Sequence, residues 1–124
     1  YIDNAMLVVG DTPAPYVPLH SAEEWDRCQR YYEVHGGAYA SLGIWGYRSG
    51  ADAEWEVYQQ FTARKSVTPT VTKVGTWDVY NTGQPTVDGP SVSGYRLKIV
   101  SLAAGVMFAQ VNSSDDVVTA EANP

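Results

Sequence analysis

The sequence has little of what most catalytic and metal sites require: it contains one cysteine, two histidines and none of the common catalytic motifs. Cys28, as the single cysteine, excludes an intrachain disulfide and a zinc site built from several cysteines. A G-x-S-x-G nucleophile turn, an H-E-x-x-H metal motif and a glycine-rich phosphate loop are all absent. We therefore expect a protein that is not an enzyme and that needs no cofactor and no metal.

Positive charge and long apolar runs are also scarce. Eight Lys and Arg residues stand against 14 Asp and Glu residues, which gives a net charge of −6, and the longest basic run is the pair Arg64-Lys65. Such a chain is poorly suited to bind nucleic acid or anionic lipid. No apolar run approaches the roughly 20 residues that span a bilayer. We expect neither a nucleic-acid partner nor membrane insertion.

Aromatic residues, by contrast, are plentiful, and most of them carry a polar tip. Among 124 residues there are nine Tyr and four Trp but only two Phe, and 44% of the chain is hydrophobic. That content is sufficient for one core in a chain of this length. Tyr and Trp favour surfaces that are partly in water, because they combine an apolar ring with a polar group. The composition predicts one main core and aromatic side chains near the surface.

The first 19 residues differ in character from the rest. Residues 1–9 are mostly apolar and predict a strand, and residues 12–18 contain three prolines. Proline fixes φ and removes a backbone donor, so this second stretch predicts an extended connector. We assign 1–19 to the terminal strand and Pro-rich linker of a preceding module, and 20–124 to a C-terminal β domain.

One short helix is expected where the second domain begins. Ser21-Ala-Glu-Glu24 has the spacing of a capping box, in which a hydroxyl and a glutamate satisfy the first free amides of a helix. Apolar side chains then recur every three or four positions, which predicts one face packed on the domain with Cys28 buried as a small hydrophobic residue. Gly36-Gly37 ends the segment. The apolar stripe consists of Ala22, Trp25, Cys28 and Tyr32.

Beyond Gly37 the pattern alternates with a period of two, which is typical of a β-sandwich or barrel. The stretch 81–94 is rich in Gly, Pro, Ser, Thr and Asp and predicts a surface loop. Strands are predicted over 31–35, 38–48, 53–64, 69–80, 94–101, 105–111 and 116–121. Turns are predicted at 49–50, 81–83, 88–90 and 104–105.

The predicted strand 38–48 has two dissimilar faces. One is aliphatic and should point into the core, whereas the other carries Tyr39, Trp45 and Tyr47 next to small residues. Sugar rings have apolar C–H faces and polar edges, so a shallow aromatic platform suits them. Tyr39, Trp45 and Tyr47 are therefore our candidate carbohydrate-binding residues. The competing interpretation is that this face packs on a second sheet or on a neighbouring subunit.

Two acidic pairs could support other chemistry. Glu54 and Glu56 share one strand face about 7 Å apart, a spacing that overlaps that of inverting glycosidases. A solvated strand face explains them better, because nothing in the sequence places either carboxylate in a dry pocket. Asp115-Asp116, after Asn112-Ser-Ser114, offers oxygen ligands to a cation, but a turn is the favoured interpretation.

Several segments, taken in order, resemble one known family. Ser21-Ala-Glu-Glu-Trp-Asp-Arg-Cys-Gln-Arg-Tyr-Tyr32 resembles the E-L-x-x-C-Q-R-Y-Y signature near the C-terminus of tailed-bacteriophage tail fibre, tailspike and receptor-binding proteins. Residues 61–72 are similar to the family's F-P-x-x-M-R-x-x-P-T-V-T strand, although Lys65 stands beyond the Arg and the Phe-Pro pair is lost. Val118-Thr-Ala-Glu-Ala122 resembles its T-A-D-A-E-L ending. Residues 1–16 look like the last strand and exit linker of a jelly-roll carbohydrate-binding module.

The resemblance implies an antiparallel, jelly-roll-like β-sandwich that assembles as a homotrimer at the tip of a fibre or tailspike. It also implies an extracellular location on the virion, attachment to the rest of the fibre before Tyr1, and binding to host surface polysaccharide. A purely structural trimerisation or head-fibre module without its own ligand is the alternative. Because an acidic protein is repelled by an acidic capsule, we expect a neutral or amino-sugar glycan, or a bridging cation.

Overall fold

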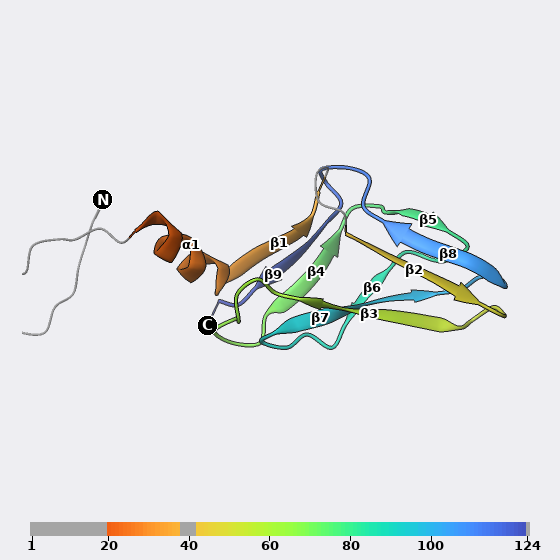
Figure 1. Cartoon of the computed structure of the whole chain (residues 1–124), viewed down its shortest axis with the longest axis horizontal. Helices are drawn as coiled ribbons and strands as arrows, with labels where there is room; N and C mark the ends of the chain where they lie inside the picture. The colour runs from red at the N-terminus through yellow and green to blue at the C-terminus, as the bar shows by residue number, and fades with distance from the viewer. Residues whose placement is uncertain (1–19, 38–41, 124) are drawn as a thin grey trace, which may run out of the picture.

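The computed structural model describes residues 20–37 and 42–123, which form one short helix and antiparallel β-strands (Figure 1). The all-β fold with a short N-terminal helix is therefore confirmed. The strand and linker predicted within 1–19, and the candidate Tyr39, lie outside the described residues. The elements are α1 (Ser21–Gln29), β1 (Tyr32–Gly36), β2 (Gly43–Arg48), β3 (Glu54–Gln60), β4 (Thr70–Val74), β5 (Asp78–Tyr80), β6 (Thr86–Asp88), β7 (Gly94–Val100), β8 (Gly105–Gln110) and β9 (Val117–Glu121).

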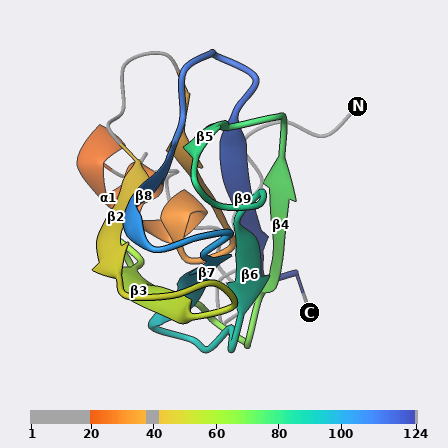
Figure 2. The same cartoon turned by 90° about the vertical axis from the view of Figure 1, so that its right-hand side faces the viewer.

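The strands in the described part of the chain form three antiparallel sheets of three strands each. Their orders are β1-β9-β4, β2-β8-β5 and β3-β7-β6. Each sheet thus takes one strand from the first three, one from the middle three and one from the last three, and β7, β8 and β9 are the central strands. Viewed along the molecule, the sheets surround a common interior (Figure 2). No sheet is built from a contiguous piece of sequence.

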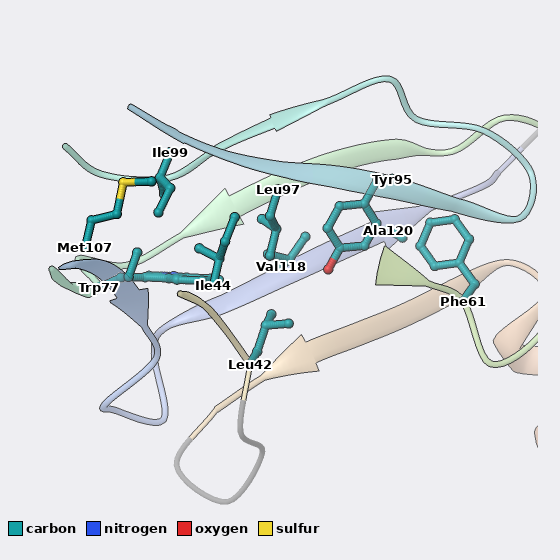
Figure 3. Packing of buried hydrophobic residues seen from close by; sticks show 11 residues of the cluster. Leu42, Ile44, Phe61, Trp77, Tyr95, Leu97, Ile99, Met107, Val118 and Ala120 are labelled. Carbon is teal, nitrogen blue, oxygen red and sulfur yellow. The ribbon is translucent and has the colours of Figure 1, made fainter. Parts of the chain in front are cut away.

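The core is filled mainly by the central strands (Figure 3). Alternate residues of β7, β8 and β9 point inward, as the period of two requires. Each central strand has partners on both sides, so its inward side chains are covered from several directions. The buried cluster consists of Leu42, Ile44, Phe61, Trp77, Tyr95, Leu97, Ile99, Met107, Ala109, Val118 and Ala120.

The strand predicted over 69–80 is wrong as a single element, because β4 and β5 belong to different sheets. The break falls at Gly75, whose φ of 84° lies in the left-handed region that favours glycine. Trp77 then turns into the core and is 2% exposed. The Gln84 amide accepts from the Trp77 N–H at 3.0 Å and donates to the Trp77 carbonyl at 2.9 Å. The Gln84 side chain thus satisfies the backbone groups of Trp77 that a neighbouring strand would otherwise bind.

The surface loop predicted over 81–94 is also wrong in part, because it contains β6. This strand pairs with β7, and Val87 packs against the core. Thr82 is buried and its hydroxyl donates to the Val100 carbonyl at 2.8 Å. The polar composition concealed a strand because the outward side chains on both sides of Val87 are Thr86 and Asp88.

The helix begins where expected, but its apolar stripe is not buried. His20, rather than Ser21, is the N-cap, and its Nδ1 accepts from the Ala22 N–H at 3.3 Å. No residue of α1 is buried, and Cys28 is exposed, so the prediction of a packed stripe with a buried cysteine is wrong. The physical reason is position: α1 lies at one end of the molecule, beyond the sheets (Figure 1).

The loop that carries Asp115 and Asp116 forms the turn that the sequence favoured. Asp116 is 2% exposed, and its carboxylate accepts from the Asn112 N–H at 3.3 Å. Among residues 20–37 and 42–123, no three His, Cys, Asp or Glu side chains come together as they would around a metal ion. Within the same ranges, no helix has the length and apolar character needed to cross a bilayer.

Candidate functional site

The outer face of the β2-β8-β5 sheet carries an aromatic row that crosses all three strands. In the antiparallel register Trp45 lies opposite Phe108, and Phe108 lies opposite Tyr80. The next row along β2 and β8 pairs Tyr47 with Val106. Residues opposite one another on neighbouring strands are close enough for their side chains to interact. We call these five residues the aromatic face.

The aromatic face is largely open to solvent. Trp45 is 53% exposed, Tyr47 67%, Tyr80 60% and Val106 57%, whereas the intervening inward residues Ile44 and Met107 are 0% exposed. The alternation predicted for strand 38–48 is therefore confirmed over its described part. These exposures exclude packing of Trp45 and Tyr47 on another sheet formed by residues 20–37 and 42–123. Contiguous exposed apolar surface on a protein of this size marks an interaction site.

Trp45 and Tyr80 are held in defined positions. The Trp45 ring lies above Gly43, because a Cβ added at residue 43 would lie only 2.5 Å from the ring carbon Cη2. On the other side of the row, the rings of Tyr80 and Phe108 are 5.8 Å apart and within 16° of parallel. A bare backbone beneath the indole and an aromatic neighbour beside Tyr80 keep the row broad and shallow.

Polar groups and a hollow border the aromatic face. Gln110 lies opposite Asp78 one row away, and its amide donates to the Asp78 carboxylate at 3.4 Å. Beside Tyr80 and Val106 the surface forms a hollow of about 510 Å³. Asn81 shapes its wall by donating to the carbonyls of Ala103 at 3.1 Å and Val106 at 3.2 Å. The hollow is lined by Tyr80, Asn81, Ala103, Ala104, Gly105 and Val106.

The outer face of the β3-β7-β6 sheet has the opposite character. Glu54 pairs with Lys98 at 3.0 Å, and Arg96 bridges Glu56 at 3.2 Å and Asp88 at 3.0 Å. The hydrogen bond from Lys98 to Glu54 raises the pKa of the lysine. Both glutamates thus belong to solvated cross-strand ion pairs, which agrees with the interpretation of 53–64 as a strand with one wet face. No dry pocket surrounds either carboxylate in the described structure.

A buried polar network lies under the helix end, away from the aromatic face. Lys65 Nζ donates to Glu33 Oε2 at 2.7 Å, and the Thr62 N–H donates to Glu33 Oε1 at 2.9 Å. Burial alone would raise the pKa of Glu33, but the hydrogen bonds from Lys65, Thr62 and His35 lower it to about 2. Because the ionised carboxylate only accepts, His35 Nε2–H donates to it at 2.7 Å, and Nδ1 accepts from the Tyr95 hydroxyl at 3.0 Å.

The network also includes Tyr95 on β7 and the C-terminal end of α1. Burial and the charge of Glu33 raise the pKa of Tyr95, so its hydroxyl stays protonated and remains a donor. Lys65 Nζ also donates to the Gln29 carbonyl at the end of α1. The cluster therefore ties the helix end, β1 and the 61–66 segment to β7, and its role is structural.

A second exposed apolar surface is formed by α1 and β1. Trp25 is 66% exposed, Tyr32 49% and Val34 44%. These side chains line a hollow of about 250 Å³ together with Cys28, Gln29 and Glu33. We call it the helix-end surface. Two separate apolar surfaces thus remain uncovered in the described chain, one at the helix end and one on the β2-β8-β5 sheet.

Of the three candidates predicted from sequence, Trp45 and Tyr47 lie together on the aromatic face, and Tyr39 is outside the described residues. Phe108, Tyr80 and Val106 were missed. Alternation over 105–111 separated Val106 and Phe108 from Met107 and Ala109, but both sets are apolar, so it could not tell which set faces water. Tyr80 joins the row only through strand pairing over a long sequence distance.

Comparison with known proteins adds no relative: no family model, no curated protein and no solved structure matches the chain.

Proposed function

We propose that this chain is a glycan-binding module that attaches a virion fibre or tailspike to host surface polysaccharide. The observation that carries the proposal is the row Trp45–Phe108–Tyr80, in which Trp45 and Tyr80 are exposed and Phe108 is half-buried, with exposed Tyr47 beside it. Aromatic rings offer flat apolar surfaces to the C–H faces of sugars. The Asp78 carboxylate and the Gln110 amide lie at the border of the row, where they can accept from and donate to sugar hydroxyls.

The virion location, the homotrimeric state and the connection to a longer fibre rest on the sequence resemblance. Its most specific part, Cys28-Gln-Arg-Tyr-Tyr32, runs from the end of α1 into β1. Three copies on one tip would combine shallow sites of modest affinity into strong attachment to a repeating polymer, because the second and third contacts become intramolecular. A shallow aromatic face is sufficient for such a multivalent role, and no catalysis is required.

Binding to intact host cells tests the proposal, with and without enzymatic removal of their surface polysaccharide. Trp45→Ala should weaken binding by roughly tenfold or more, because the largest ring of the aromatic row is lost. Tyr58→Ala is the matched control, since Tyr58 is 52% exposed and lies on β3, in the β3-β7-β6 sheet whose outer face carries the ion pairs. Binding that resists polysaccharide removal, or that Trp45→Ala leaves unchanged, would refute the proposal.

The helix-end surface supports a second candidate function, a structural trimerisation or head-fibre module without a ligand. Trp25 and Val34 are exposed apolar side chains on neighbouring elements, and a second copy could cover them. Sedimentation mass decides this point: a value near three times 13.5 kDa that falls in Trp25→Ser supports assembly through this surface. A trimer that binds no glycan and no host cell would favour this candidate over the first.

A further inference from the structure

We infer that the ligand of the aromatic face is an uncharged polysaccharide, bound through an internal stretch that crosses the three strands and enters the hollow beside Tyr80. The inference rests on the proposed glycan-binding function and specifies its ligand. It assigns two parts to one site: the row Trp45–Phe108–Tyr80 as the platform, and the hollow between Asn81 and Ala104 as the place of the next sugar residue.

The length of the row argues for a chain rather than a terminal sugar. Neighbouring strands lie about 4.8 Å apart, so the backbone positions of Trp45 and Tyr80 are separated by roughly 10 Å across β8. That is wider than one sugar ring, which is about as broad as one aromatic side chain. β2 and β5 are the edge strands of their sheet, so among the described residues no further strand of the sheet bounds the row at either end. A linear polymer can therefore enter and leave without ending in the site.

The hollow continues the platform. Tyr80 and Val106 belong to the aromatic face and also line the hollow, so a chain that reaches Tyr80 has the hollow as its next neighbour. Its far wall consists of Ala103, Ala104 and Gly105, whose small side chains leave room for a ring. The two hydrogen bonds from Asn81 to the Ala103 and Val106 carbonyls hold this wall in place.

Charge selects the class of polymer. Among the described residues of the aromatic face, its polar border and the hollow, Asp78 is the only charged one, and it is acidic. The whole chain also carries −6. An acidic polysaccharide would meet no cation here and would be repelled, whereas an uncharged one is bound by stacking and hydrogen bonds. Its affinity should accordingly be insensitive to ionic strength.

The test is calorimetric titration with dextran, mannan and galactan as uncharged polymers and with alginate as the acidic comparator. Oligosaccharides of graded length are then prepared from the polymer that binds. Affinity should rise with length until the row and the hollow are filled, and it should not change when salt is raised.

Ala104→Trp fills the hollow and should reduce affinity for the longest oligosaccharide by about tenfold while leaving the shortest binders unaffected. Trp45→Ala should weaken all lengths.

The matched control is Ala22→Trp, which places the same side chain on α1, at the opposite end of the molecule (Figure 1). It should bind all lengths as the wild type does. Equal binding of single sugars and long chains, preference for alginate, or an unchanged length profile in Ala104→Trp would each overturn the inference while leaving glycan binding intact. Absence of binding to every polymer, together with host-cell binding that Trp45→Ala leaves unchanged, would instead overturn the proposed function.

Discussion

At the scale of single residues, the buried pair of Glu33 and Lys65 shows how this acidic chain accommodates charge in its interior. The side chain of Lys65 is 0% exposed and that of Glu33 is 5% exposed. Two charges removed from water are tolerated only when hydrogen bonds satisfy their remaining groups. Here Thr62 and His35 complete the shell of the carboxylate, and the Gln29 carbonyl accepts from the ammonium. These hydrogen bonds offset the desolvation of the two charges, and the one to Gln29 anchors the end of α1.

The depressed pKa of Glu33 makes stability depend on pH. Between pH 4.5 and about 2 the unfolded chain binds a proton at this carboxyl that the folded chain does not, so the free energy of unfolding rises with pH. The contribution is complete above pH 4.5 and is lost as pH falls toward 2, by about 3 kcal/mol. Urea unfolding at a series of pH values measures it. Glu33→Gln should be less stable at neutral pH and should lack this part of the slope; parallel profiles for both proteins would contradict the assignment.

Gly43 is the residue on which the position of the Trp45 ring depends. Gly43→Ala should push the indole off its place, because the new Cβ would lie 2.5 Å from the ring, while the exposed side chain can swing away at little cost in stability. We expect glycan affinity to fall severalfold with an unfolding free energy within about 0.5 kcal/mol of wild type. Gly50→Ala is the control, since an added Cβ there meets nothing within 4 Å. Unchanged tryptophan fluorescence and unchanged affinity in Gly43→Ala would refute the role of Gly43.

At the scale of elements, the alternation of apolar and polar residues predicted which side chains of a strand face the core, but it did not predict which strands pair. Over 53–64 the glutamates alternate with Trp55 and Val57, which pack against the core, and over 38–48 alternation placed Trp45 and Tyr47 outward. It could not reveal that β4 and β5 separate at Gly75, because a lone glycine in an alternating run is compatible with a continuous strand. The aromatic row could be predicted only in part, because Phe108 and Tyr80 come to lie beside Trp45 through the pairing of β2, β8 and β5.

The stripe on α1 failed for a different physical reason. Helical periodicity predicts an apolar face but not what covers it, and the described structure leaves this face uncovered. Trp25 of this stripe, together with Val34 on β1, belongs to the exposed helix-end surface. The apolar face is readable from the sequence, but its exposure is visible only in the fold.

Hydrogen exchange of α1 tests this view of the helix. A nine-residue helix with no buried side chain is marginal by itself, so the amides before its anchored C-terminal end should exchange almost without protection in dilute protein, unlike those of the central strand β8. If copies associate through the helix-end surface, protection of α1 should grow with protein concentration, and Trp25→Ser should abolish that growth. Protection of α1 equal to that of β8 in dilute monomer would contradict the prediction.

At the scale of the whole molecule, we expect the three sheets to unfold together. Each contains one strand from each third of the strand order, and their inward residues share one cluster (Figure 3). Loss of any third of the chain would remove a strand from every sheet. The two chemically different outer faces, one aromatic and one ion-paired, therefore belong to sheets that share one core.

Leu97 tests this cooperativity, because it is 1% exposed on central strand β7 and belongs to the cluster shared by the sheets. Leu97→Ala should lower the free energy of unfolding by about 2–5 kcal/mol, since it leaves a cavity where the sheets meet. Tryptophan fluorescence and far-UV circular dichroism should still report one coincident transition. Leu102→Ala is the matched control: Leu102 is 65% exposed, and its loss should change stability by less than about 0.5 kcal/mol. Separate transitions in Leu97→Ala would show that the sheets are independent units.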